Sequence, residues 1–349
     1  MAHPVPQALV VVENGCRAKM ADDEQRVRTA LGGHREEVSV PDLVEGVRQH
    51  GRLTLNFHPD RRSREGHTVA AGLLETGRYQ PQTETGVSNG SRSAVPEGER
   101  TQWERTLFGA AYVDSAVTRP VYGALDLTRD PHGGSPRFGS SFVILAASCL
   151  DRATFCVGDS HVGPTDLGTI ECFTAILAGL LEQGADDAGL GRSLSVGDIV
   201  TAIQQGEPTV APARCLDGYI EAQVHGDVLL GDDVDAIVLD PSFRGTPTET
   251  LLDLAADQHQ FELMWHGGSE LAATLVPDDF RGPTMPELAQ LVARADGIVD
   301  AACLGRCAEN IAYTPPTRSG DAPESPLQQV KYLWHCLLHH GRDAERASG

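Results

Sequence analysis

The alternation of apolar and polar residues predicts β-strands that each have an apolar back and a polar front. The clearest is the segment 218–226, in which aliphatic residues alternate with a glutamate, a glutamine and a histidine. Because side chains on a strand point alternately to its two faces, Glu221, Gln223 and His225 share one face. A face that combines carboxylate, amide and imidazole groups is typical of a strand that lines a cleft.

Two other segments, far apart in the sequence, have the same construction. The strand predicted at 52–58 carries Asn56 and His58 on its polar face. A later strand carries Tyr122 on its polar face, opposite a row of aliphatic residues. If the polar faces of the three strands converge, they form one site that contains His58, Tyr122 and Glu221.

The periodicity of the remaining chain divides it into three regions of an α+β protein. Residues 1–45 have a charged, helical pattern, residues 46–245 contain the predicted strands, and residues 246–349 are mainly helical. Residues 62–100 are rich in Gly, Ser, Thr and Glu, which predicts a long loop. Helices are predicted at 22–31, 99–112, 170–184 and 330–338, and further strands at 138–145, 152–158 and 235–240.

Composition narrows the class of protein and its partners. The 349 residues carry a formal net charge of −21, and such an acidic surface disfavours nucleic acid and anionic membranes as partners. No stretch approaches the roughly 20 apolar residues of a membrane helix, and the N-terminus does not resemble a secretory peptide. We therefore expect a cytoplasmic protein whose eight cysteines stay reduced.

Five segments resemble an uncharacterised bacterial family, defined only as a domain of unknown function, over roughly residues 50–245. The last three of these segments also resemble toxin-like domains of the ADP-ribosyltransferase superfamily. The segments are 56–61 (NFHPDR), 84–90 (ETGVSNG), 119–123 (RPVYG), 152–160 (RATFCVGDS) and 219–226 (YIEAQVHG).

The resemblance implies a split antiparallel β core of the ADP-ribosyltransferase type, flanked by helical N- and C-terminal regions, with NAD as substrate in the cleft between the halves. Glu221 would act on the nicotinamide ribose, because a carboxylate stabilises the oxocarbenium-like centre formed when nicotinamide leaves. Gln223 would orient the acceptor, which is a protein side chain, a nucleotide, a small molecule or water. His58 would contact the adenosine ribose. The residues expected to line the NAD site are Asn56, Arg61, Ser88, Asn89, Tyr122, Gly123 and Ser140.

Other interpretations of the same residues stay open. Three His/Asp pairs, at 58 and 60, 159 and 161, and 225 and 227, suit a metal-dependent hydrolase. A weaker zinc set combines cysteines and histidines near the C-terminus. The third possibility is an inactive protein that binds NAD, and each side chain taken singly is more often structural than catalytic. The zinc set consists of Cys303, Cys307, His335, Cys336 and His339.

Overall fold

The computed structural model describes residues 6–36, 38–87, 99–114, 117–206, 215–309, 311 and 325–344. Within these residues the largest sheet has eight strands in the order β10-β9-β4-β1-β3-β7-β5-β6. Neighbouring strands are antiparallel except for β9 and β10, which are parallel. The predicted α+β class is therefore confirmed.

The strands of this sheet are β1 (Arg52–Phe57), β3 (Val121–Asp126), β4 (Ser141–Leu145), β5 (Ala153–Val157), β6 (Leu167–Thr169), β7 (Ile220–Val224), β9 (Val234–Leu239) and β10 (Glu262–Trp265). Two short sheets pair β2 (Arg78–Tyr79) with β8 (Val228–Leu229), and β11 (Leu271–Ala272) with β12 (Ile298–Val299).

The helices are α1 (Gln7–Leu31), α2 (Val40–His50), α3 (Val69–Thr76), α4 (Gln82–Thr85), α5 (Glu99–Phe108), α6 (Thr174–Ala185), α7 (Val196–Gln205), α8 (Leu230–Asp233), α9 (Pro247–His259), α10 (Met285–Val292), α11 (Ala301–Glu309) and α12 (Pro326–His340). Short 3-10 helices include η2 (Pro136–Phe138) and η4 (Ser160–Val162).

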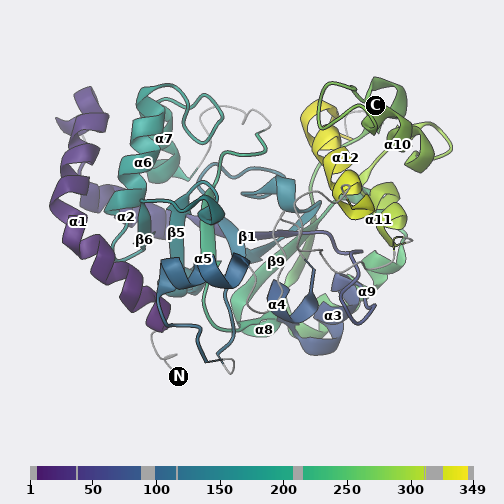
Figure 1. Ribbon diagram of the computed structural model, residues 1–349, viewed down its shortest axis with the longest axis horizontal. Helices are drawn as coiled ribbons and strands as arrows, with labels where there is room; N and C mark the ends of the chain where they lie inside the picture. The colour runs from purple at the N-terminus through teal and green to yellow at the C-terminus, as the bar shows by residue number, and fades with distance from the viewer. Residues whose placement is uncertain are drawn as a thin grey trace.

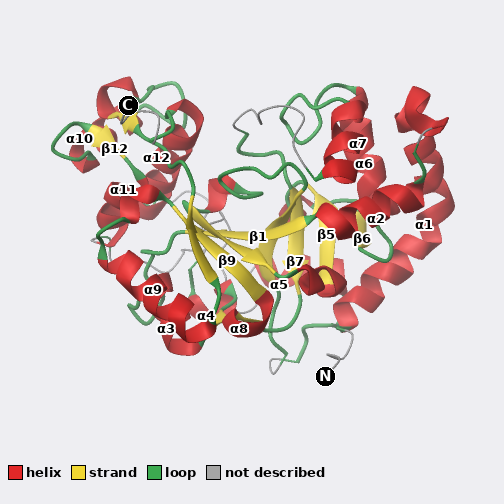
Figure 2. Ribbon diagram, turned by 180° about the vertical axis from the view of Figure 1, so that it is seen from behind, coloured by secondary structure: helices red, strands yellow, loops and turns green. Residues whose placement is uncertain are grey.

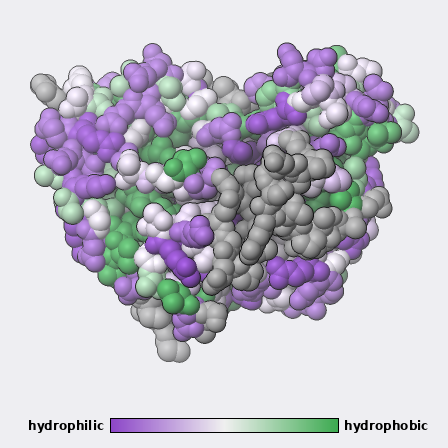
Figure 3. Space-filling view, in the orientation of Figure 1, coloured by the Kyte–Doolittle hydropathy of each residue, from purple (hydrophilic) through white to green (hydrophobic). Residues whose placement is uncertain are grey.

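The helices gather into two groups on either side of the sheet. Figure 1 shows α1, α2, α6 and α7 beside β5 and β6, and α3 and α9 to α12 on the side of β9. Figure 2 shows the same arrangement from behind, with the strands visible between the two groups of helices. On the face seen in Figure 3, polar residues spread over both lobes, with apolar residues in small patches. No described helix combines the length and the apolar character needed to cross a bilayer.

The core follows the predicted strand pattern. The apolar faces of the central strands, including Leu55, Leu125 and Ala222, are at most 2% exposed and pack into one cluster with residues of the flanking helices. A second cluster joins the C-terminal helices, and the predicted apolar stripe of α12 belongs to it. Burial of these two clusters fixes the sheet and the C-terminal helices as the frame of the molecule.

The prediction of a long loop at residues 62–100 was wrong for the part that the structure describes. Between residues 62 and 87 the chain forms α3, β2 and α4. Helix α3 spans only eight residues, so it has too few turns to show a helical period. It is bounded instead by its ends: the Thr68 side chain accepts a hydrogen bond from the Ala71 N–H, and Gly77 closes the helix in the left-handed conformation.

The sheet also continues past the predicted boundary at residue 245. Strand β10 pairs with β9 over Glu262 to Trp265, although it lies in the region expected to be mainly helical. This strand follows α9, so the chain makes a parallel crossover there. The C-terminal region is thus joined to the core through the sheet as well as through helix packing.

The sheet forks between β1 and β3. These strands pair from Arg52 to Thr54 on β1, and beyond Thr54 strand β1 pairs with β4 alone while Val121 to Gly123 pair with β7 alone. Gly123 lies at the fork, where an added Cβ atom would stand 2.2 Å from the carbonyl oxygen of Thr54. Only glycine permits this close approach of the two backbones.

The fork predicts a strong size limit at residue 123. We expect Gly123→Ala to lower the free energy of unfolding by about 1–3 kcal/mol, because the new methyl group overpacks the contact with β1. Urea denaturation measures the change. The control is Gly15→Ala in α1, where a Cβ atom meets nothing within 4 Å and the helix gains up to about 1 kcal/mol. Equal effects at the two positions would contradict the close contact.

Candidate functional site

A cavity of about 260 Å³ opens at the fork of the sheet. Asn56 and Phe57 of β1 line one side, and Tyr122 and Gly123 of β3 line the other. Because successive residues on a strand point to opposite faces, the cavity extends through the plane of the sheet. Glu221 of β7 also lines it, as do residues of α3, β2, α4 and α5. We call this cavity the fork cleft.

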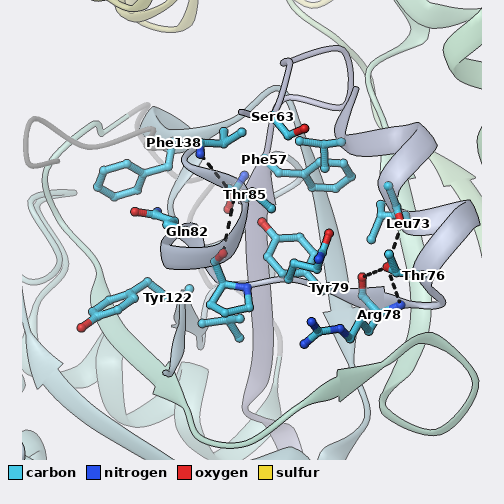
Figure 4. A pocket seen from close by; sticks show the side chains of 18 of the residues that line it. Phe57, Ser63, Leu73, Thr76, Arg78, Tyr79, Gln82, Thr85, Tyr122 and Phe138 are labelled. Atoms are coloured by element: carbon cyan, nitrogen blue, oxygen red, sulfur yellow. Dashed lines mark hydrogen bonds between the residues drawn. The ribbon is translucent and has the colours of Figure 1, made fainter. Parts of the chain in front are cut away.

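Aromatic rings are concentrated in the fork cleft. Phe, Tyr and Trp make up 5% of the sequence, yet Phe57, Tyr79, Trp103, Tyr122 and Phe138 all line this one cavity. The ring centres of Phe57 and Tyr79 are 5.9 Å apart, edge to face. Figure 4 shows these two rings facing those of Tyr122 and Phe138 across the cavity. Such walls accept a flat, unsaturated ring.

Glu221 is a buried carboxyl group at the back of the fork cleft. Its side chain is on the face predicted from the alternating pattern, and the residue is 6% exposed. It accepts hydrogen bonds from Gln223 Nε2 at 2.8 Å and from the Ser160 backbone N–H at 3.3 Å. Burial and the nearby Asp159 raise the pKa of Glu221 to about 7, against the effect of these hydrogen bonds.

A chain of hydrogen bonds behind the cleft holds Glu221 in place. The side-chain oxygen Oε1 of Gln223 accepts a hydrogen bond from the Thr154 hydroxyl at 2.7 Å. This bond directs the Nε2 group of Gln223 toward Glu221. Thr154 also bonds His225 Nε2 at 2.9 Å, and His225 Nδ1 bonds the Tyr112 hydroxyl. Gln223 and Thr154 are fully buried. Gln223 therefore serves in this structure to orient Glu221.

Asp159 and His161 form a second polar pair in the fork cleft. His161 Nδ1 lies 2.6 Å from Asp159 Oδ1, and both side chains are 27% exposed. Burial works to raise the pKa of Asp159, but the hydrogen bonds from His161 outweigh it and lower that pKa. Asp159 thus stays ionised beside Glu221, whose pKa is raised. Two neighbouring carboxyl groups with separated pKa values are typical of acid and base roles at one site.

Tyr122 is held by α5 and by a buried carboxylate. Its hydroxyl donates to Glu104 at 2.9 Å, and Glu104 in turn pairs with Arg119. The Arg100 guanidinium lies 4.7 Å from the centre of the Tyr122 ring and 4.8 Å from that of Trp103. Burial, then Glu104, raises the pKa of Tyr122, so its hydroxyl stays neutral. The ring is a fixed wall of the cleft, and the Arg100 guanidinium that lies over it lines the same cleft.

The structure brings together some of the predicted site residues and separates others. Asn56, Tyr122, Gly123 and Glu221 line the fork cleft, and Gln223 lies directly behind it. His58 and Arg61 line a neighbouring, smaller cavity under α12, where the His58 ring meets Trp334 edge to face at 5.4 Å. The carbonyl of buried Ser140 accepts from His266, outside the cleft. Ser88 and Asn89 lie outside the described residues.

The three His/Asp pairs do not meet. His58 and Asp60 line the small cavity, Asp159 and His161 bond each other in the fork cleft, and Asp227 pairs with Arg78. The C-terminal set is also dispersed: Cys336 Sγ bonds the Phe280 carbonyl, and Cys303 Sγ bonds the Asp300 carbonyl. Among the described residues no group of three or more His, Cys, Asp or Glu side chains is placed to hold a metal ion.

For several residues of the site, no pattern in the sequence distinguishes them from residues with a purely structural role. Tyr79, Trp103 and Phe138 lie in segments predicted as loop, helix and strand, and nothing in the sequence places them around one cavity. Thr154 is part of an apolar strand, so its hydroxyl gave no indication of a role. Asp159 and His161 were found by their spacing but assigned to a metal.

Comparison with known proteins gives a family. Residues 52–340 match the family described as "Protein of unknown function (DUF3626)". The chain belongs to this family. The match runs from the first residue of β1 to the last of α12, so the C-terminal helices are part of the family domain and α1 and α2 precede it. The predicted resemblance to a family of unknown function is confirmed, and the resemblance to ADP-ribosyltransferases stays a prediction.

The chain is also similar to the Gene 2 protein of Mycobacterium phage L5. The two are 30% identical over 168 residues, which are 46% of this chain and 57% of the phage protein. This chain therefore spans little more than half the length of that relative.

The buried carboxyl group predicts a stability that depends on pH. The pKa of Glu221 rises from 4.5 to about 7 on folding, so its stabilising contribution is complete below pH 4.5 and is lost as the pH passes 7. We expect Glu221→Gln to become more stable relative to the wild type over this range, by on the order of 3 kcal/mol. Urea denaturation between pH 4 and pH 8.5 measures the difference.

The matched control is Glu262→Gln on the exposed side of β10. The difference in free energy of unfolding between this variant and the wild type should stay constant across the same pH range. A flat profile for Glu221→Gln as well would mean that Glu221 ionises as freely in the folded state as in the unfolded chain.

Proposed function

We propose that this protein cleaves the bond between nicotinamide and ribose in NAD and transfers ADP-ribose to an acceptor or to water. The observation that carries the proposal is the position of Glu221, a buried carboxyl group at the back of an aromatic cleft that opens through a fork in the sheet. The acceptor is a protein side chain, a nucleotide, a small molecule or water.

The arrangement of the strands supports a split core of the ADP-ribosyltransferase type. The resemblance requires a first strand, a middle strand and a late strand that converge on NAD. Here β1, β3 and β7 are direct neighbours in the sheet, and β1 and β3 separate at Gly123. The strands that part leave backbone N–H and C=O groups without ladder partners, and such groups can bind a carboxamide.

The chemistry of the bond explains why a carboxylate is needed. When nicotinamide leaves, the electron pair of the C–N bond goes to the pyridinium nitrogen, and the ribose carbon takes the positive charge. The carboxylate of Glu221 stabilises that charge, which develops only in the transition state. The acceptor then adds to this carbon and releases a proton, which the Asp159–His161 pair is placed to accept at the more exposed side of the cleft.

The aromatic walls supply a place for the nicotinamide ring. Tyr122 is fixed by Glu104, and its ring faces the cavity that Glu221 lines. Stacking on Tyr122 brings the ribose carbon of a bound NAD toward the carboxyl group. In this arrangement the adenosine part of NAD stays outside the small cavity under α12, and His58 and Arg61, which line that cavity, would contact its ribose and its pyrophosphate respectively.

The proposal predicts a specific loss in Glu221 variants. Incubation of the purified protein with NAD should release nicotinamide, measured by chromatography. Glu221→Gln, which keeps the shape of the side chain, should lower kcat by roughly 10²- to 10³-fold and leave NAD affinity nearly unchanged. The same holds for Glu221→Ala. Turnover at the wild-type rate in either variant would end the proposal.

Because Glu221 must be ionised, kcat/KM of the wild type should rise with pH and level off above about 7. The control carboxyl variant, Glu262→Gln, should keep both the rate and the pH profile.

The hydrogen-bond chain behind the cleft gives a further test. Thr154→Val keeps the volume of the side chain but removes the hydroxyl that directs the Gln223 amide toward Glu221. We expect kcat to fall by about tenfold with little change in KM, and the midpoint of the pH profile to move upward, because Glu221 loses a directed donor. A structural role alone would lower stability and leave the midpoint in place.

A further inference from the structure

Cationic side chains gather where α12 packs against η2. The Trp334 indole N–H donates to the Pro136 carbonyl at 2.9 Å, which fixes the helix on this turn. Lys331 Nζ then lies 5.8 Å from the centre of the Phe138 ring, and Arg137 Cζ lies 5.1 Å from the centre of the same ring. Two positive charges therefore lie beside the Phe138 ring, and this ring also lines the fork cleft.

Two further arginines complete the cluster. Burial lowers the pKa of Lys331 to about 8, and the positive charges of Arg137, Arg281 and Arg61 contribute to this shift. Arg61 also lines the small cavity with Lys331. The cluster thus draws on the turn after β1, on η2, on the segment before α10 and on α12. We call Arg61, Arg137, Arg281 and Lys331 the α12 cationic cluster.

The charges of the α12 cationic cluster are poorly compensated. In the described part of the chain Lys331, Arg61 and Arg281 make no ion pair, and Arg137 pairs only with exposed Asp217. Lys331 is 7% exposed. The acidic groups that act on Lys331 and Arg61 are Asp159, which is bonded to His161, and Asp60, whose pKa burial raises to about 7. Burying unpaired charges is unfavourable, particularly for cations gathered together.

Unsatisfied donors point to the same place. The Nε atoms of Arg137 and Arg281 are buried and have no hydrogen-bond partner among the described residues. His335 lies one turn beyond Lys331 on the same face of α12 and is 1% exposed, with its ring against the Arg137 backbone. Polar atoms buried in this way are normally satisfied, so the cluster has the composition of a site that lacks its anion.

We propose that the α12 cationic cluster is a binding site for a phosphate group. Arg and Lys side chains at a buried, partly unsatisfied site match the charge and the several acceptor oxygens of a phosphate. The cavity that reaches Lys331 and Arg61 has a volume of only about 20 Å³, so it admits part of an oxyanion and not a nucleoside. The remainder of a phosphorylated ligand would lie on the Phe138 side, toward the fork cleft.

The chain contains two lysines, which provide a matched pair of variants. Lys331→Met removes the buried charge and keeps the length of the side chain, whereas Lys19→Met removes an exposed charge from α1. Calorimetric titration with inorganic pyrophosphate at low ionic strength should show binding to the wild type and to Lys19→Met. Affinity should fall roughly ten- to a hundredfold in Lys331→Met. Arg281→Met serves as a second variant if Lys331→Met does not fold.

The source of the phosphate is decided by the same variants titrated with NAD. A parallel loss of NAD affinity in Lys331→Met means that the site holds the pyrophosphate of the dinucleotide. Unchanged NAD affinity together with lost pyrophosphate binding means that it holds the phosphate of a second substrate. The wild type failing to bind pyrophosphate at millimolar concentration, or all three proteins binding it equally, overturns the proposal. None of these outcomes depends on nicotinamide release, so the proposed function is tested separately.

Discussion

The separation of β1 from β3 is the constraint on which the rest of the structure depends. Beyond the fork, β1 stays paired with β4 and β3 stays paired with β7. The two halves of the sheet therefore keep their hydrogen bonds while a gap opens between β1 and β3. Gly123 permits the close contact from which the strands diverge. The part of the cavity that β1, β3 and β7 line has rigid walls, because these strands are buried in a single core. The side chains of Asn56, Tyr122 and Glu221 are therefore positioned by the sheet.

Charge is distributed unevenly between the fork cleft and the smaller cavity under α12. Glu221 and Asp159 both line the fork cleft: burial and the nearby Asp159 raise the pKa of Glu221, whereas hydrogen bonds from His161 lower that of Asp159. The α12 cationic cluster lies beyond Phe138, on the side of the C-terminal helices. In a chain of net charge −21, a buried group of cations is the exception that needs a reason. A ligand with a cationic ring at one end and phosphates toward the other would match this arrangement, and NAD has that distribution of charge.

The sequence predicted the strands better than it predicted the cavity. Period-two alternation located β1, β3 and β7 and assigned Asn56, Tyr122 and Glu221 to one front, because a strand with one buried face must alternate. Where the pattern is too short to repeat, as in α3, the prediction of a loop was wrong. Strand β10 was not predicted because it lies among helical segments. It has only four residues, which are too few to show a clear alternation of apolar and polar side chains.

The side chains of the site were predictable only where they belong to a strand. His58 follows the last residue of β1, and beyond a strand end the alternation no longer fixes the direction of a side chain. It therefore lies beside Trp334, a residue 276 positions later in the chain. Gln223 was placed on the correct face, but the partner that decides its role, Thr154, comes from a neighbouring strand. Such contacts depend on strand order, which one sequence does not reveal.

The most direct test is a crystal structure with an NAD analogue in which carbon replaces the ribose ring oxygen, so that the bond to nicotinamide cannot break. The account predicts electron density for the nicotinamide ring against Tyr122 in the fork cleft, with the ribose 2′-hydroxyl within hydrogen-bond distance of Glu221. Density for the analogue at a different surface, with the fork cleft filled only by water at saturating concentration, would contradict it.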